Sequence, residues 1–349
     1  MSSIVLPFEH QRAVDKRLVG GKAHGLAVMT QAGITVSPGF TFTTHAYQQY
    51  LEQSGLRERI RDAIAAVDHN SIDALDEMAR HVKSWFDEIA LSDDLMQALT
   101  DAYGSLCDMV GVPDVSVAVR SSATAEDSAG ASFAGEYETY VGMCGIREVE
   151  LHVRRCWSSA FSARALSYVW KNAIDPMAIE MAVVIQKTVN ARAAGVLFTV
   201  SPVTGDRSRI VIEASYGLGL GVVGGEVTPD RYVVAKVEGQ VMERVVGDKH
   251  IEYLTNEVPT LVELERRTSL CLEDAEVLGL AKIGKRLERL HGAPQDIEFA
   301  IDRDLPPGEN LVLLQCRPIT VLPSHARQAQ QPLHDALTKF ASSVISAAK

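Results

Sequence analysis

The feature that most constrains the fold is a change of hydrophobic pattern near Val115. Before it, apolar residues recur every three or four positions, most clearly between Ser71 and Val110, as expected of amphipathic helices. After it, short runs rich in β-branched residues are bounded by Gly, Ser and Asp, which is typical of strands. The chain is therefore predicted to be an α+β protein. We predict strands over 115–119, 180–189, 195–200, 209–214, 231–237 and 311–315, and helices over 147–170 and 272–290.

The length of the chain, 349 residues, favours two domains over one. An apolar strand passes through a short polar turn, Val189-Asn190-Ala191, into a new strand, and we place the lobe boundary there. This division gives a first lobe of residues 1–189 and a second lobe of residues 190–323. The Gln- and Ala-rich residues 324–349 are expected to form a linker or a docking helix.

Composition excludes several classes of function. A net charge of −11 disfavours a nucleic-acid surface, and no apolar run is long enough to span a bilayer. The first residues lack the pattern of a signal peptide, so we expect a cytoplasmic protein. Five cysteines with no C-x-x-C pair favour neither a disulfide framework nor a zinc site. Any phosphates bound here must therefore be met by local cations.

Gly20-Gly21-Lys22 is the first segment that indicates chemistry. A glycine pair and a lysine lead into an apolar helix, where backbone N–H groups and an ammonium can meet phosphate oxygens. The segment is not a Walker A motif, because no glycine lies five positions before Gly21. A helix start with a solvated lysine is the alternative.

The second segment runs from Val117 to Ser128. We predict an apolar strand that ends at Arg120, followed by a loop that begins with Ser121 and Ser122. A fixed guanidinium beside many hydroxyl donors suits a polyphosphate. The alternative is an exposed serine-rich turn with an arginine at the strand end.

The third segment contains a formal G-x-G-x-x-G between Gly219 and Gly224. A dinucleotide site needs a helix after these glycines, and Pro229 disfavours one. We therefore favour a glycine-rich turn that lets backbone approach a ligand. A dinucleotide-dependent oxidoreductase remains the rival hypothesis, and Leu220 is given no role.

The fourth segment is a predicted hairpin. Strand alternation puts Asp296 and Glu298 on one face, and likewise Gln315 and Arg317. The turn between Asp302 and Asn310 can bring the two pairs together. Carboxylate and amide oxygens beside a fixed cation are what a Mg²⁺-polyphosphate site requires. A half-solvated hairpin with an ordinary ion pair is the alternative.

Taken in order, these segments resemble the ATP-binding region of phosphoenolpyruvate synthase, pyruvate phosphate dikinase and rifampicin phosphotransferase. The resemblance extends from Val19 to Pro323. It implies an ATP-grasp fold, in which two lobes clamp ATP in a cleft between them. Its most specific parts are residues 119–127, 132–135, 195–202, 294–298 and 314–320.

For the first lobe, the resemblance implies that Lys22 and Arg120 hold phosphates, with Thr139 close by. It also implies that Gln186 lies along the adenine, on the strand that links the lobes.

For the second lobe, the resemblance makes Glu213 a nucleotide contact. Asp296, Glu298, Gln315 and Arg317 match the family's metal and phosphate residues. Glu298 and Gln315 are the implied metal ligands, Arg317 steadies the phosphates, and Asp296 contributes to cofactor binding by holding a second metal or by orienting these ligands. The implied catalytic residues are Lys22, Arg120 and Arg317, and the implied cofactors are ATP and Mg²⁺.

The implied reaction passes a phosphoryl group from Mg-ATP to a histidine and releases AMP and phosphate. In the family this histidine lies in a swivelling domain with a Thr/Ser-His-Ala motif. The letters Ser-His-Ala occur at residues 324–326, but His325 and His334 lie in a polar tail with no Gly-rich or Thr-rich context. We therefore expect a separate subunit that carries the histidine and binds the small-molecule acceptor. The ATP-binding subunit of phenylphosphate synthase, which activates phenol, fits this division.

Other functions stay open beside this one. The chain fits a non-catalytic nucleotide-binding regulatory module, or a subunit of a pyruvate/phosphoenolpyruvate synthase. An acyl-phosphate-forming ligase on the same fold would instead produce ADP and need no histidine.

Overall fold

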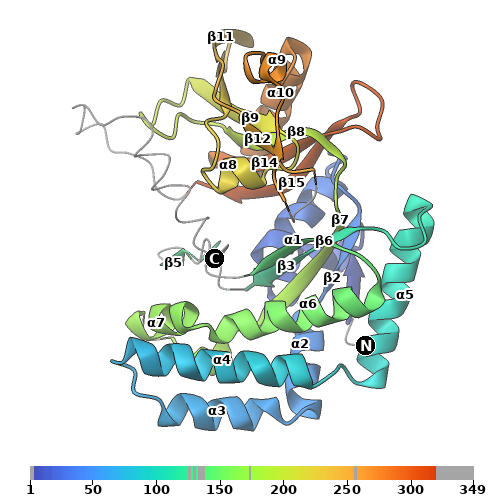
Figure 1. The fold of residues 1–349 in the computed structure, drawn as a ribbon, viewed down its shortest axis with the longest axis vertical. Helices are drawn as coiled ribbons and strands as arrows, with labels where there is room; N and C mark the ends of the chain where they lie inside the picture. The colour runs from blue at the N-terminus through green and yellow to red at the C-terminus, as the bar shows by residue number, and fades with distance from the viewer. Residues whose placement is uncertain are drawn as a thin grey trace. The chain divides into compact units, whose positions relative to one another are not determined.

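The computed structural model describes residues 4–124, 127–128, 131–132, 138–172, 174–254 and 258–319 (Figure 1). Helices and strands are both abundant among them, which confirms the α+β prediction. The chain divides into two compact units. The first comprises the described residues of Met1–Gln31 and Pro38–Thr188, and the second comprises Ala32–Ser37 and those from Val189 on. The expected tail, residues 324–349, lies outside the described residues.

An antiparallel five-stranded sheet forms the centre of the first unit. Its strands lie in the order β1 (Val5–Pro7), β2 (Gly39–Phe42), β7 (Met181–Lys187), β3 (Val117–Ala123) and β6 (Thr139–Met143). A short pair, β4 (Asp127–Ser128) and β5 (Ala131–Ser132), lies outside this sheet. The helices described in this unit are α1 (Lys16–Gln31), α2 (Thr44–Gln53), α3 (Leu56–Ala66), α4 (Ile72–Glu88), α5 (Asp93–Val110), α6 (Ile146–Ser158) and α7 (Ala163–Lys171), with 3-10 turns η1 (Gln11–Val14), η2 (Ser159–Phe161) and η3 (Pro176–Ala178).

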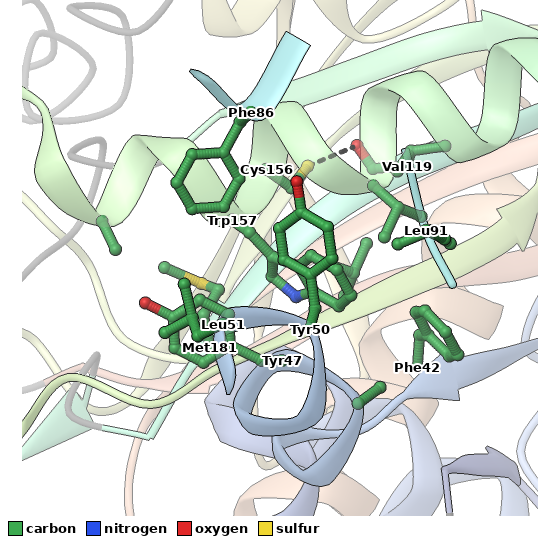
Figure 2. Close-up of a cluster of buried hydrophobic side chains, with 14 of the residues drawn as sticks. Phe42, Tyr47, Tyr50, Leu51, Phe86, Leu91, Val119, Cys156, Trp157 and Met181 are labelled. Carbon is green, nitrogen blue, oxygen red and sulfur yellow. Dashed lines mark hydrogen bonds between the residues drawn. The ribbon is translucent and has the colours of Figure 1, made fainter. Parts of the chain in front are cut away.

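An aromatic cluster covers one face of this sheet (Figure 2). Trp157 of α6 stacks on Phe42 of β2 with ring centroids 5.5 Å apart, and Tyr50 of α2 lies 5.2 Å from it. Val119 of β3 belongs to the same core. Since successive strand residues point to opposite faces, the residues on either side of Val119 point away from this core. Arg120, the residue after Val119 on β3, therefore lies on the other face of the sheet.

Two long helical patterns in the sequence are each divided in the structure. The pattern over 71–110 becomes α4 and α5, because the chain leaves the helix at Ile89 and starts again after Ser92. The pattern over 147–170 becomes α6 and α7, separated by η2. Ser162 begins α7, since its hydroxyl accepts a hydrogen bond from the Ala165 N–H at 3.2 Å. Hydrophobic periodicity is retained across the second break, whereas at the first break the buried residues Phe86 and Leu95 are nine positions apart and would lie on opposite sides of one continuous helix.

The second unit is built on a six-stranded antiparallel sheet. Its strands lie in the order β11 (Gln240–Val245), β10 (Asp230–Ala235), β9 (Arg209–Tyr216), β8 (Ala191–Phe198), β14 (Gln295–Asp302) and β15 (Leu311–Pro318). The remaining elements described are β12 (Ile251–Glu252), β13 (Thr260–Leu261), α8 (Leu220–Val223), α9 (Leu264–Arg267) and α10 (Asp274–His291).

The long helix α10 packs on one face of this second sheet. A Cβ atom added at Gly284 would lie 2.8 Å from the Leu197 side chain of β8, so the helix approaches the sheet closely there. Leu197 is the register partner of Ile212 on β9 and Ile297 on β14, and these residues share its face. The residues that alternate with them, including Asp296 and Glu298, lie on the opposite face.

The segment Ala32–Ser37 completes the edge of the second sheet. The Leu313 N–H of β15 donates a hydrogen bond to the Thr35 carbonyl at 3.0 Å, and Val36 pairs with Leu313 in parallel. Arg286 of α10 donates to the Ala32 carbonyl. Residues that the sequence assigned to the first lobe therefore belong with the second unit. None of the helices in the described part of the chain is long and apolar enough to cross a membrane.

Candidate functional site

Lys22 is held against β3 by an interruption of α1. Gly20 has a φ of 74°, and a Cβ atom there would lie 2.0 Å from the Ser122 carbonyl oxygen, so only glycine permits this approach. The Ser122 hydroxyl accepts a hydrogen bond from the Ala23 N–H at 3.1 Å. Nζ of Lys22 donates to the Ser121 carbonyl at 3.0 Å. The lysine is thus anchored to β3 and not freely solvated.

Arg120 lies in the middle of β3, not at a strand end as predicted. The strand continues through Ser121 and Ser122 to Ala123, so the two serines are part of the sheet and not of a loop. Both pair with β7 and have buried side chains. The sequence misled here because small hydroxyl residues are common in turns, whereas in this strand they let α1 approach.

Three of the predicted residues share one face of the first sheet. Arg120 lies directly opposite Thr139 of β6, and Gln186 of β7 lies opposite Ala118 of β3. Directly paired residues point to the same face, and so do residues two apart on a strand. Ser122, which contacts α1, has the same parity, so this is the face on which α1 packs. The structure therefore gathers Lys22 with these three residues.

Gln186 is almost fully buried on this face, whereas Thr139 is exposed at the edge strand. Burying an amide is costly unless its polar atoms are paired.

In the second unit, the predicted hairpin sets its four residues in two pairs. Asp296 is the register partner of Arg317, and Glu298 is the register partner of Gln315. Nε and Nη2 of Arg317 lie 2.9 Å and 2.8 Å from Oδ2 of Asp296. The guanidinium is therefore fixed in orientation by its neighbour. The prediction that the turn brings these residues together is confirmed.

The pKa of Asp296 is raised, chiefly because the carboxyl group is buried. The charge and hydrogen bond of Arg317 act in the opposite direction, while the nearby Glu298 carboxylate adds to the rise. The ion pair is thus an interaction that Asp296 needs in order to remain ionised in a buried place.

A polar row extends from this hairpin across the sheet. Glu298 pairs with Val196 of β8, Val196 with Glu213 of β9, and Glu213 with Arg231 of β10. All of these register partners lie on the face opposite α10. Glu213, predicted from the second lobe, therefore shares a face with the hairpin residues.

Arg231 is a residue of this row that sequence reasoning missed. Burial raises the pKa of Glu213, and the positive charge of Arg231 opposes that rise. Arg231 also forms an ion pair with Glu243 of β11 at 3.0 Å. Its place beside Glu213 depends on the register of β9 with β10, which no local motif indicates.

Glu298 and Gln315 form a donor set that fits Mg²⁺. They offer a carboxylate and an amide oxygen from directly opposed positions on β14 and β15. In the part of the chain that the structure describes, no group of three or more His, Cys, Asp or Glu is placed to hold a metal. Mg²⁺ is typically held by one or two protein oxygens, with phosphate and water completing its shell. The two residues fit that mode and not a dedicated protein cage.

The glycine-rich segment after β9 does not form a dinucleotide site. It contains only the four-residue helix α8, and the following strand β10 runs antiparallel to β9. A dinucleotide-binding unit needs two parallel strands joined by a crossover helix. The formal G-x-G-x-x-G therefore serves as a turn, as the position of Pro229 indicated.

Comparison with known proteins gives a consistent match. Residues 16–336 match the family described as pyruvate phosphate dikinase, AMP/ATP-binding domain. A probable phosphoenolpyruvate synthase of Methanothermobacter thermautotrophicus is 38% identical over 97% of this chain and 49% of its own length. The phosphoenolpyruvate synthase of Aeropyrum pernix is 38% identical over 90% of this chain and 42% of its own length.

The chain spans less than half the length of these two curated relatives. A crystal structure from Pyrococcus horikoshii Ot3 covers 70% of this chain and 100% of that chain, at 12% identity and a TM-score of 0.29, which is too low to bear on the fold.

Proposed function

Because the chain belongs to the family of pyruvate phosphate dikinase AMP/ATP-binding domains, we propose that it binds Mg-ATP and donates a phosphoryl group to a histidine. AMP and phosphate are the other products, and one water molecule is consumed, because both phosphoanhydride bonds of ATP are cleaved while the histidine accepts one phosphoryl group. The observation that carries this proposal is the hairpin register, which sets a fixed guanidinium and two metal-ligand oxygens side by side. We further propose an ATP-grasp arrangement, in which each unit supplies one set of ligands.

Three cations carry the phosphate chemistry in this proposal. Lys22 and Arg120 come from the first unit and Arg317 from the second. Lys22 is oriented by its hydrogen bond to β3, Arg120 by its place in β3, and Arg317 by its bond to Asp296. Phosphoryl transfer asks the protein mainly for positioning and charge neutralisation. A magnesium ion on Glu298 and Gln315 supplies further neutralisation when bound. Asp296 holds the Arg317 guanidinium in place.

The nucleoside end of ATP is assigned to polar groups without a positive charge. The buried amide of Gln186 suits the adenine edge, because it offers both a donor and an acceptor. The Glu213 carboxylate suits a hydroxyl or amino donor. Thr139, opposite Arg120, offers a hydroxyl to a phosphate oxygen.

The acceptor histidine is proposed to lie on a separate subunit. Two tripeptides have the letters of the acceptor motif: Ser324-His325-Ala326, which lies outside the described residues, and Thr44-His45-Ala46. The latter lies at the start of α2, where the Thr44 hydroxyl donates to the Arg17 carbonyl at 2.9 Å and Nδ1 of His45 is buried. A histidine fixed in this way is unsuited to carry a phosphoryl group between sites.

The final acceptor is proposed to be a small molecule bound by the partner subunit. The names of the relatives make pyruvate the first substrate to test. Phenol, expected from the similarity to phenylphosphate synthase, is the second.

The test combines binding and turnover. Calorimetry is expected to show Mg-ATP binding by the purified chain, while AMP release by the chain alone stays negligible and rises when a candidate histidine subunit encoded beside it is added. His45→Gln and His325→Gln should each leave both results unchanged. Phosphorylation of pyruvate or phenol by these 349 residues alone would contradict the separate histidine. Release of ADP would indicate the ligase, and binding without turnover alongside every candidate subunit would indicate a regulatory module.

A further inference from the structure

A cavity of about 250 Å³ lies between α10 and the strands β9 and β10 of the second unit. Ile210 and Val234, two of its lining residues, are register partners and fully buried. Ile210 has the same parity as Ile212, which shares the α10 face, whereas Glu213 lies on the other face. The cavity is therefore on the opposite side of the sheet from the polar row.

One wall of the cavity is apolar. Ala281 of α10 is buried beside Ile210 and Val234, while Leu278, one turn earlier, is 39% exposed. A leucine left partly in water at the mouth of an apolar cavity gains free energy when a ligand covers it, at roughly 25 cal/mol per Å² of apolar surface. The wall thus favours an apolar ligand body.

The rim of the cavity is cationic. Lys282, Lys285 and Arg289 lie on α10 at spacings of three and four, so they project from one side of the helix, and Lys236 faces them from the end of β10. Lys236 is paired with Glu288 at 2.7 Å. Among the described residues, no carboxylate forms an ion pair with the other three cations, in a chain whose net charge is −11.

Placement at a helix end does not account for this rim by itself. Cations near a helix C-terminus are favourable because of the helix dipole, and this explains Arg289. Lys282 lies more than two turns before the end of α10, where the dipole has little effect. Like charges three or four residues apart repel by about 0.2–0.5 kcal/mol per pair. An anion between them relieves that repulsion.

We propose that this cavity is a second binding site, for a small organic anion that carries a carboxylate or phosphate head on an apolar body. The head binds Lys282, Lys285 and Arg289, and the body contacts Leu278 and Ala281. The volume is below the roughly 300–1,000 Å³ of pockets for drug-sized ligands, so the ligand is about as large as benzoate and much smaller than ATP.

The experiment measures benzoate binding to the intact chain by calorimetry, with saturating Mg-ADP present to occupy the nucleotide site. Lys282→Gln/Lys285→Gln should weaken benzoate binding at least about tenfold, since each charge-assisted hydrogen bond is worth more than a neutral one. Ala281→Leu, which fills the cavity without changing charge, should do the same. Arg80→Gln/Lys83→Gln is the matched control, because it removes two exposed cations three apart on α4 and should change nothing.

Two further probes separate head from body. Benzyl alcohol lacks the charge and inorganic phosphate lacks the apolar body, so each should bind at least about tenfold more weakly than benzoate. Equal benzoate binding by the Lys282/Lys285 variant and the wild type would overturn the proposal, as would phosphate binding as tight as that of benzoate. A hexaglutamate peptide that binds in place of benzoate, with the same dependence on Lys282 and Lys285, would overturn it in favour of an acidic protein partner. Circular dichroism checks whether Ala281→Leu is folded. If it is not folded, benzoate binding by Lys282→Gln/Lys285→Gln decides the test.

Discussion

The cations of the first unit and the polar row of the second reach their places by different routes. Lys22 meets the Ser121 carbonyl across 99 residues of chain, through a helix interruption that only Gly20 permits. Arg317 meets Asp296 across 21 residues, through a hairpin whose register follows from strand alternation. The second arrangement is local and the first is not. Perturbing the first should therefore disturb the fold as well as the site, whereas perturbing the second should disturb mainly the chemistry.

The largest effect is expected from Glu298→Ala. Losing a proposed metal ligand should lower single-turnover phosphoryl transfer by roughly 100- to 1,000-fold, because stabilisation of developing charge is lost. The thermal midpoint should change little, since Glu298 is only partly buried. Glu309→Ala, in the exposed turn of the same hairpin, is the matched control. Normal phosphoryl transfer by Glu298→Ala would show that Glu298 is not a metal ligand.

Arg120→Lys is expected to come next. The substitution keeps the charge of Arg120 but loses the planar fork that makes two parallel hydrogen bonds to a phosphate. Misplacing a reacting phosphate by about 1 Å costs on the order of a hundredfold in rate, so transfer should fall much more than ATP affinity. Rapid-quench transfer measured beside equilibrium binding separates the two, with Arg147→Lys, at an exposed position of α6, as control. If neither quantity moves, Arg120 does not hold phosphate.

Gly20→Ala tests whether the placement of Lys22 is coupled to the stability of the first unit. The positive φ costs about 1 kcal/mol for a residue with a side chain, and the close approach to Ser122 adds about 1 kcal/mol or more. We expect the free energy of unfolding of the first unit to fall by about 2 kcal/mol, with a loss of ATP affinity as Lys22 shifts. All three tryptophans lie in this unit, so their fluorescence during urea unfolding reports on it.

Gly55→Ala is the control for this prediction. Gly55 also has a positive φ, of 70°, but nothing lies within 4 Å of an added Cβ atom. Its loss should be limited to the conformational cost, and ATP affinity should not change. Equal losses from the two variants would show that the contact with Ser122 contributes nothing.

The smallest effect concerns pH. Burial raises the pKa of Glu213 and Arg231 opposes the rise, so Arg231→Gln should raise that pKa further. If the ionised carboxylate binds nucleotide, ATP affinity falls as the pH drops through the raised pKa, and in the variant this fall begins at a higher pH. The raised pKa also means that the protonated carboxyl is favoured on folding, so the variant should lose stability as pH rises through its pKa.

Titration of ATP affinity between about pH 5 and pH 8 tests this prediction, with an expected change of less than about tenfold at any pH. Arg244→Gln is the control, because Arg244 pairs in register with Tyr232, on the α10 face, and bonds to Asp274. An unshifted profile for Arg231→Gln would show that Arg231 does not influence the nucleotide contact.

Strand alternation was enough to predict the hairpin half of the candidate site. Asp296, Glu298, Gln315 and Arg317 needed only a period of two and a plausible turn, and the structure pairs them accordingly. The strand over Arg209–Ala214 was predicted from its run of β-branched residues and extends to Tyr216. Local pattern and final structure agree where the contacts are between strands adjacent along the chain.

The remaining features depend on contacts that local pattern does not contain. Ser121 and Ser122 have turn-like composition, yet they lie in a strand because α1 packs on it. Arg231 joins the polar row only through the register of β9 with β10. In each case tertiary packing overrides a local preference.

The placement of residues 32–37 has a consequence for the order of synthesis. A ribosome releases Thr35 and Val36 early, but their partner Leu313 emerges only near the end of the described chain. The second sheet therefore stays incomplete at its β15 edge until Leu311–Pro318 have been translated. A fragment that starts at Val189 would expose that edge, with its unpaired N–H and C=O groups, to other chains. A peptide of residues 32–37 supplied in trans is the natural complement to such a fragment.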